Sequence, residues 1–216
     1  MENMYIIDTE TASLHGGVVE LAYLRVDMEL NVLQESCVRV NPERPIDPHA
    51  QAVHGISDED VALCPTLAEV TTEFTEPVIW CGHNAPFDIR MLNPHIRPDV
   101  TLCTLVLSRE YIKGTTNQKL ETLKAELKLP EQQSHSALGD VHTTRDLLLH
   151  ILPIAGVTLT TLIERASVPR LIAKMPFGKH KGITMTRVPR DYRDWLLAQG
   201  DIDRNLRFTL EKLSKV

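Results

Sequence analysis

The sequence predicts an α/β fold in which helices cover a mixed β-sheet, and two patterns support this prediction. Three β-branched and apolar segments follow one another at residues 4–9, 18–26 and 32–40, as in an antiparallel meander. The chain then alternates short apolar runs with helical spacings up to about residue 152. A meander followed by alternating strands and helices is typical of a layered fold with helices packed on a sheet.

Prolines follow the meander, and residues 48–74 are expected to form two short helices. The apolar run at residues 78–83 predicts a fourth strand, which leads into a helix that includes Phe87. Asn84 is the expected N-cap of this helix, because its side chain can accept hydrogen bonds from free backbone N–H groups.

The second half of the predicted domain contains one more strand and two further helices. Residues 101–107 are expected to form a strand that runs into a helix, and the leucine spacing at residues 120–129 predicts an amphipathic helix that Pro130 ends. A long helix is expected at residues 136–152, with Pro153 as its stop. These boundaries divide the chain into a first domain at residues 1–155, a linker at 156–168 and a small module at 169–216.

Composition places the protein in a broad class without assigning a function. Hydrophobic residues make up 43% and charged residues 24% of the chain, which are ordinary values for a globular protein and argue against disorder. The four cysteines form no CxxC pair, so neither a zinc ribbon nor a disulfide framework is indicated. No apolar run is long enough to cross a bilayer and the N-terminus lacks a signal-peptide pattern, so we expect a cytoplasmic protein.

Four carboxylates and one histidine suggest chemistry on phosphate. Asp8 and Glu10 follow the first apolar strand two residues apart, so their side chains should share one face. Asp88 falls in the first turn of a predicted helix, and Asp140 follows His135 by five residues at the start of another. Hydrolysis of a phosphodiester by two divalent ions requires a compact cluster of hard oxygen ligands of this kind.

These residues occur in motifs that resemble the DEDD superfamily of 3′-to-5′ exonucleases, in the variant with a catalytic histidine. The matching segments are IIDTE with the acid pair, NAPFD with Asp88, HSALGD with His135 and Asp140, and VHGIS at residues 53–57. The resemblance covers about residues 4–152 and implies a ribonuclease-H-like fold with a mixed five-stranded sheet flanked by helices.

The resemblance also implies a role for each motif residue. Asp8 would bridge two Mg²⁺ ions, which Mn²⁺ could replace, Glu10 and Asp140 would bind mainly one ion, and Asp88 would bind the other. His135 would be the general base, since imidazole titrates near neutral pH. The residues implied to contact the terminal nucleotide or shape its pocket are Thr9, Thr11, His54, Ile56, Asn84 and Phe87, although Ile56 and Phe87 fit an ordinary core equally well.

The segment after residue 169 resembles the C-terminal module of exodeoxyribonuclease X-like proteins. It contains the turn FGKHKG and then VPRDYRDWLL, where Val188, Tyr192, Trp195 and Leu196 could form one face of a helix. Residues 165–190, which include the turn, have seven Lys or Arg and no Asp or Glu. Lys179 and Lys181 could contact phosphates from this turn, and a purely structural turn is an equal alternative.

The expected function is therefore a metal-dependent exonuclease that acts at DNA 3′ ends, single-stranded or duplex, and releases nucleoside 5′-monophosphates, with DNA repair as the expected process. Three alternatives stay open: an exoribonuclease with the same carboxylates, a polymerase proofreading subunit, and a nucleic-acid-binding module without turnover. A protein of this last kind would bind single-stranded DNA in EDTA and never cleave it.

Overall fold

The computed structural model describes residues 4–72, 74, 79–132, 136–199 and 202–214. The chain forms two compact units, residues 1–167 and 168–216, and each is described by itself. His135, the expected general base, lies outside the described residues.

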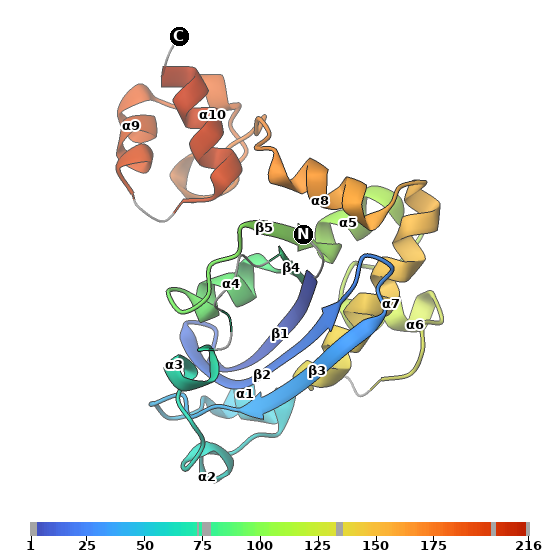
Figure 1. Ribbon diagram of the computed structural model, residues 1–216. Helices are drawn as coiled ribbons and strands as arrows, with labels where there is room; N and C mark the ends of the chain where they lie inside the picture. The colour runs from blue at the N-terminus through green and yellow to red at the C-terminus, as the bar shows by residue number, and fades with distance from the viewer. Residues whose placement is uncertain (1–3, 73, 75–78, 133–135, 200–201, 215–216) are drawn as a thin grey trace. The chain divides into compact units, whose positions relative to one another are not determined.

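The first unit is built on a five-stranded mixed sheet (Figure 1). Its strands lie in the order β3-β2-β1-β4-β5. Strands β1, β2 and β3 form the antiparallel meander, whereas β4 pairs parallel to β1 and β5 parallel to β4. The expected ribonuclease-H-like α/β fold is thus confirmed. The strands span Met4–Ser13 (β1), Gly16–Val26 (β2), Val32–Arg39 (β3), Ile79–Gly82 (β4) and Val100–Cys103 (β5).

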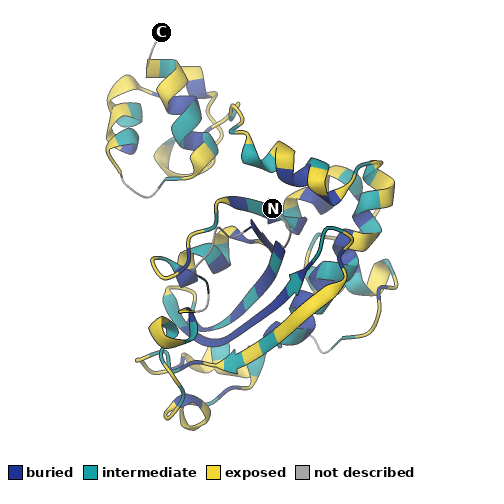
Figure 2. Ribbon diagram, viewed as in Figure 1, coloured by how far each residue is buried: buried dark blue, intermediate teal, exposed yellow. Residues whose placement is uncertain are grey.

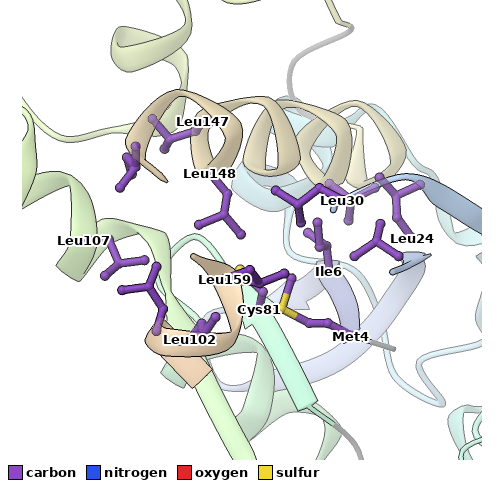
Figure 3. Close-up of a cluster of buried hydrophobic side chains, with 14 of the residues drawn as sticks. Met4, Ile6, Leu24, Leu30, Cys81, Leu102, Leu107, Leu147, Leu148 and Leu159 are labelled. Atoms are coloured by element: carbon purple, nitrogen blue, oxygen red, sulfur yellow. The ribbon is translucent and has the colours of Figure 1, made fainter. Parts of the chain in front are cut away.

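Helices cover both faces of this sheet, and the side chains of β1 alternate between the two hydrophobic cores that lie under these helices. Met4 and Ile6 point toward helix α7 (Ala137–Ala155) and pack in a cluster with Leu147 and Leu148 of that helix (Figure 3). Ile7 points to the opposite face. The next side chains along the strand must continue this alternation, which decides where its carboxylates point.

The opposite face is covered by helix α4 (Pro86–Leu92), whose Met91 and Leu92 pack against Ile7 and Trp80. Strand β3 lies at the edge of the sheet, and most of its residues are exposed, whereas β1 and β2 are largely buried (Figure 2). The central strand that carries Asp8 is therefore enclosed between two helical layers.

The structure corrects three expected helix boundaries. The helix expected to end at Pro130 ends at Glu126. Asn84 is not the N-cap of α4, because Ala85 occupies that position; Asn84 has a φ of 71°, a left-handed conformation that asparagine tolerates better than most residues. Pro153 does not end α7, which continues to Ala155 and is capped by the left-handed Gly156. One proline near a helix end removes one backbone donor without stopping the last turn.

The remaining helices of the first unit flank the sheet or its ends. Two helices were expected at residues 48–74, and the described part of this segment contains three short ones. The segment at 156–168, expected as a linker, forms α8, and the buried Leu159, Leu162 and Ile163 pack in the core of the first unit. The helices span Pro48–His54 (α1), Asp58–Val61 (α2), Leu67–Val70 (α3), Thr104–Tyr111 (α5), Leu120–Glu126 (α6) and Leu159–Ser167 (α8).

Within the described parts of the chain, no single helix has the length and apolar character needed to cross a membrane. Helices α7 and α8 meet the criterion only as a pair, and they are bent by 91°.

The second unit has a small hydrophobic core of its own, formed by Met175, Met185, Val188, Leu196, Leu206 and Leu210. Two 3₁₀ turns, η1 (Gly178–His180) and η2 (Met185–Arg187), precede helices α9 (Arg190–Ala198) and α10 (Arg204–Ser214). Of the face expected at Val188, Tyr192, Trp195 and Leu196, α9 carries the last three, with Leu196 buried and Trp195 54% exposed. Helix α10 was not expected.

Candidate active site

Three carboxylates converge on the α7 side of strand β1. Asp8 and Glu10 continue the face of Met4 and Ile6, as their two-residue spacing predicted, and Asp140 lies in the first turn of α7. One carboxylate oxygen from each of these three residues lies within 4.8 Å of the others. Hard oxygen ligands at this spacing suit a divalent cation such as Mg²⁺ or Mn²⁺.

The fourth carboxylate, Asp88, approaches β1 from helix α4. Its Oδ1 accepts hydrogen bonds from the backbone N of Thr9 at 3.1 Å and from Thr9 Oγ1 at 2.8 Å. Strand β4 ends at Gly82, so the edge of β1 beyond that point is open to a side chain. Asp88 is 3% exposed, and among the residues that the structure describes it belongs to no group of three ligand atoms at the spacing above. It is nevertheless close enough to act on the charge of Asp8.

Burial raises the pKa values of these acids, and the charges of neighbouring carboxylates add to this effect at Asp8 and Glu10. Burial, and then the negative charges of Asp88, Asp140 and Glu10, raise the pKa of Asp8 well above its ordinary value. Burial, followed by the charge of Asp140, raises the pKa of Glu10 to about 7. Burial also raises the pKa of Asp88 to about 7, against the lowering effect of the hydrogen bonds from Thr9. A site whose carboxylates repel one another in this way would be relieved by a bound cation.

A fifth carboxylate, Glu20, was missed by the sequence reasoning. It pairs with Glu10 across β1 and β2, is 6% exposed, and accepts a hydrogen bond from the backbone N of Ala137 at 3.0 Å through Oε2. Its Oε1 lies 3.2 Å from Nε of Arg39. Glu20 thus joins the sheet to the first turn of α7. One signal was available, since an acid inside the apolar run VVELAYL requires a buried partner.

The predicted nucleotide-contacting residues divide into buried and accessible groups. Thr9 and Thr11 are buried, and the hydroxyl of Thr9 is bound to Asp88. Ile56 is 1% exposed and packs with Ala12 in a core at the end of β1, as the alternative interpretation expected.

The accessible members of this group lie on α1 and at the start of α4. Asn84 is exposed, and Phe87 is partly buried, with the Arg90 guanidinium 5.3 Å from its ring centroid. His54 is half-buried, and its Nδ1 accepts a hydrogen bond from the backbone N of Ile56 at 3.0 Å. Lys179 and Lys181 are exposed in the second unit.

The fold and this carboxylate cluster define a metal-dependent nuclease of the ribonuclease-H-like class. Residues 5–148 match the family model RNase_T, described as exonuclease, and the chain belongs to this family of 3′-to-5′ exonucleases. Residues 165–212 match a second model, described as a putative quorum-sensing-regulated virulence factor.

Individual relatives agree with this assignment. The chain is 34% identical to Exodeoxyribonuclease 10 of Escherichia coli K12, over 95% of this chain and 96% of that protein. It is 29% identical to DNA polymerase III subunit epsilon of Haemophilus influenzae, over 67% of this chain and 65% of that protein. A solved structure of Exonuclease X in complex with 5′ overhanging duplex DNA matches with a TM-score of 0.67 and 32% identity, over 74% of this chain and 98% of that one.

Proposed function

We propose that this protein degrades DNA from the 3′ end in the presence of Mg²⁺ or Mn²⁺, releases nucleoside 5′-monophosphates, and acts in DNA repair in the cytoplasm. The observation that carries the metal dependence is the convergence of Asp8, Glu10 and Asp140 within 4.8 Å. The DNA substrate is supported by the similarity to Exodeoxyribonuclease 10 over almost the whole of both chains.

In this proposal Asp8, Glu10 and Asp140 would hold one divalent ion, and Asp8 and Asp88 would hold a second. When bound, two such ions neutralise charge on the phosphate and favour ionisation of the attacking water. The backbone and hydroxyl of Thr9 fix the Asp88 carboxylate at the edge of β1. Glu20 holds the start of α7, and therefore the position of Asp140 relative to the two acids of β1.

His135 completes the proposed chemistry as the general base. In the sequence it directly precedes Ser136 and the start of α7, and its role is inferred from the H-x-x-x-x-D motif. An imidazole can accept the proton of the attacking water near neutral pH without being a metal ligand. We therefore expect His135→Ala to lower turnover strongly while metal affinity is largely retained, and unchanged turnover across neutral pH would contradict this assignment.

The terminal nucleotide is proposed to lie against the accessible residues Asn84 and Phe87, and near His54. The side chains of Thr9, Thr11 and Ile56 are buried, so they would pack beneath this pocket. Their backbone groups would contact the nucleotide. Ribonucleotides would be distinguished by contacts to the 2′-hydroxyl.

A nuclease assay with matched labelled strands tests the proposal. Single-stranded DNA and RNA of the same sequence, labelled at the 5′ end, are incubated with Mg²⁺, with Mn²⁺ or with EDTA. We expect metal-dependent ladders that shorten from the 3′ end and are stronger on DNA. Asp8→Asn should abolish them, whereas Asp99→Asn, which changes an exposed carboxylate before β5, should not. A stronger ladder on RNA would indicate a ribonuclease, and binding without any ladder would indicate a non-catalytic module.

A further inference from the structure

The two units of the chain carry opposite net charge. Residues 1–167 contain 12 Lys or Arg and 24 Asp or Glu, a formal net charge of −12. Residues 168–216 contain 11 Lys or Arg and five Asp or Glu, a formal net charge of +6. A polyanionic strand is repelled by the first unit except where cations bind, so the attractive field of this protein lies on the second unit.

Aromatic and basic side chains meet on the surface of this second unit. The rings of Tyr192 and Trp195 on α9 are stacked, with centroids 5.4 Å apart and an interplanar angle of 29°. Nζ of Lys179 lies 5.1 Å from the centroid of the Tyr192 ring. Together with Asp191 these side chains line an open hollow of about 430 Å³. We call Lys179, Tyr192 and Trp195 the aromatic-basic cluster.

Contacts of the Gly178 backbone and the His180 ring with Tyr192 hold the aromatic-basic cluster together. Gly178 has a φ of 70°, and a Cβ at this position would lie 2.6 Å from the hydroxyl oxygen of Tyr192. The ring of His180 meets the same tyrosine edge-on, with centroids 4.7 Å apart. The FGKHKG turn is therefore pressed against α9, and this contact places Lys179 at the ring.

Stability of the unit does not explain the exposed indole. Trp195 is 54% exposed, whereas the core of the unit is formed by neighbours such as Leu196, which is 2% exposed. A tryptophan whose ring is half in solvent contributes less burial than an inward-facing one, and a stacked aromatic pair beside a lysine matches the chemistry that binds unpaired bases.

We propose that the aromatic-basic cluster is a second binding site for single-stranded DNA, with one base stacked on Trp195 and Lys179 at a neighbouring phosphate. Asp191, which also lines the hollow, can accept a hydrogen bond from an exocyclic base amine. This inference deepens the proposed function, because it assigns to the second unit the attraction of the strand that the acidic first unit lacks. Its role is binding, separate from the chemical step.

Binding can be measured without catalysis, which separates this inference from the proposed nuclease activity. The full chain is titrated in EDTA against a 5′-labelled dT oligonucleotide, and fluorescence anisotropy gives the Kd. We expect Trp195→Ala to raise the Kd roughly tenfold, the scale of one lost base–aromatic stack, and Trp195→Phe to retain most of the affinity. Quenching of indole fluorescence should accompany binding, since Trp80 is fully buried and Trp195 is the exposed indole.

A matched pair of lysine variants tests the charged part of the cluster. Lys212 also lies over an aromatic ring of the second unit, with Nζ 5.4 Å from the centroid of Phe208, and it is not among the residues that line the hollow. Lys179→Ala should weaken binding and flatten its salt dependence more than Lys212→Ala does.

Three results would overturn the inference. They are an unchanged Kd in Trp195→Ala, an equal loss in the two lysine variants, and displacement of the strand by free dTMP at concentrations near the Kd of the oligonucleotide. The last would assign the hollow to a mononucleotide.

Discussion

Replacement of Glu10 by glutamine should stabilise the metal-free protein while it removes activity. The pKa of Glu10 is about 7, compared with an ordinary value of 4.5, because the side chain is buried beside other carboxylates. A pKa shift of one unit corresponds to about 1.4 kcal/mol, so the raised pKa of Glu10 corresponds to about 3 kcal/mol of destabilisation of the ionised folded state. Since the side chain is only partly buried, solvent screens part of this effect, and we expect a gain of about 1–2 kcal/mol in the free energy of unfolding.

The gain should depend on pH in a defined direction. Well above pH 7 Glu10 is ionised in both the folded and unfolded states, so the wild-type protein bears the full cost of the buried charge. Well below pH 4.5 it is protonated in both states and the cost disappears. The advantage of Glu10→Gln should therefore be largest near pH 8.5 and shrink as the pH falls toward 5.

Urea unfolding in EDTA at pH 8.5 and pH 5.5 measures this difference. The fluorescence of the buried Trp80 reports on the first unit, provided that both proteins carry Trp195→Phe to remove the second indole signal. Asp99→Asn serves as the control, because that carboxylate is exposed. A gain of equal size at both pH values, or no gain at pH 8.5, would refute the electrostatic reasoning.

Three further predictions concern the contacts of Thr9 and Glu20 in the first unit and of Gly178 in the second. Thr9→Val removes the hydroxyl that donates to Asp88 and should move the acidic limb of the kcat/KM profile to higher pH, while Thr9→Ser should not. Glu20→Ala leaves the backbone N–H at the start of α7 without its acceptor. This variant should lower kcat, and it should lower the free energy of unfolding by about 1–3 kcal/mol. Glu20→Gln should lower both quantities less, and equal losses in the two variants would contradict a role of Glu20 in holding α7. Gly178→Ala combines a left-handed φ with a clash at the Tyr192 hydroxyl, and thermal unfolding should show the second unit destabilised by about 1–3 kcal/mol with the first unaffected.

The sequence alone predicted the strands and the chemistry of the first unit, because both depend on local patterns. The short apolar run at the start of β1 indicated a strand, and the two-residue period of strands placed Asp8 and Glu10 on one face. The long helix at Asp140 was visible from its apolar spacing, although its end at Ala155 was not. The left-handed C-cap at Gly156 set that boundary, because Pro153 lies too near the helix end to stop the last turn.

Tertiary structure decided the contacts between elements that are distant in the chain. The hydrogen bonds of Asp88 to Thr9 span 79 residues, and that of Glu20 to Ala137 spans 117. No local pattern encodes such pairs, since they form only after the sheet brings α4 and α7 to opposite faces of β1. The aromatic-basic cluster arose in the same way, because stacking between Tyr192 and Trp195 follows from helical spacing, whereas the approach of Lys179 depends on how its turn folds onto α9.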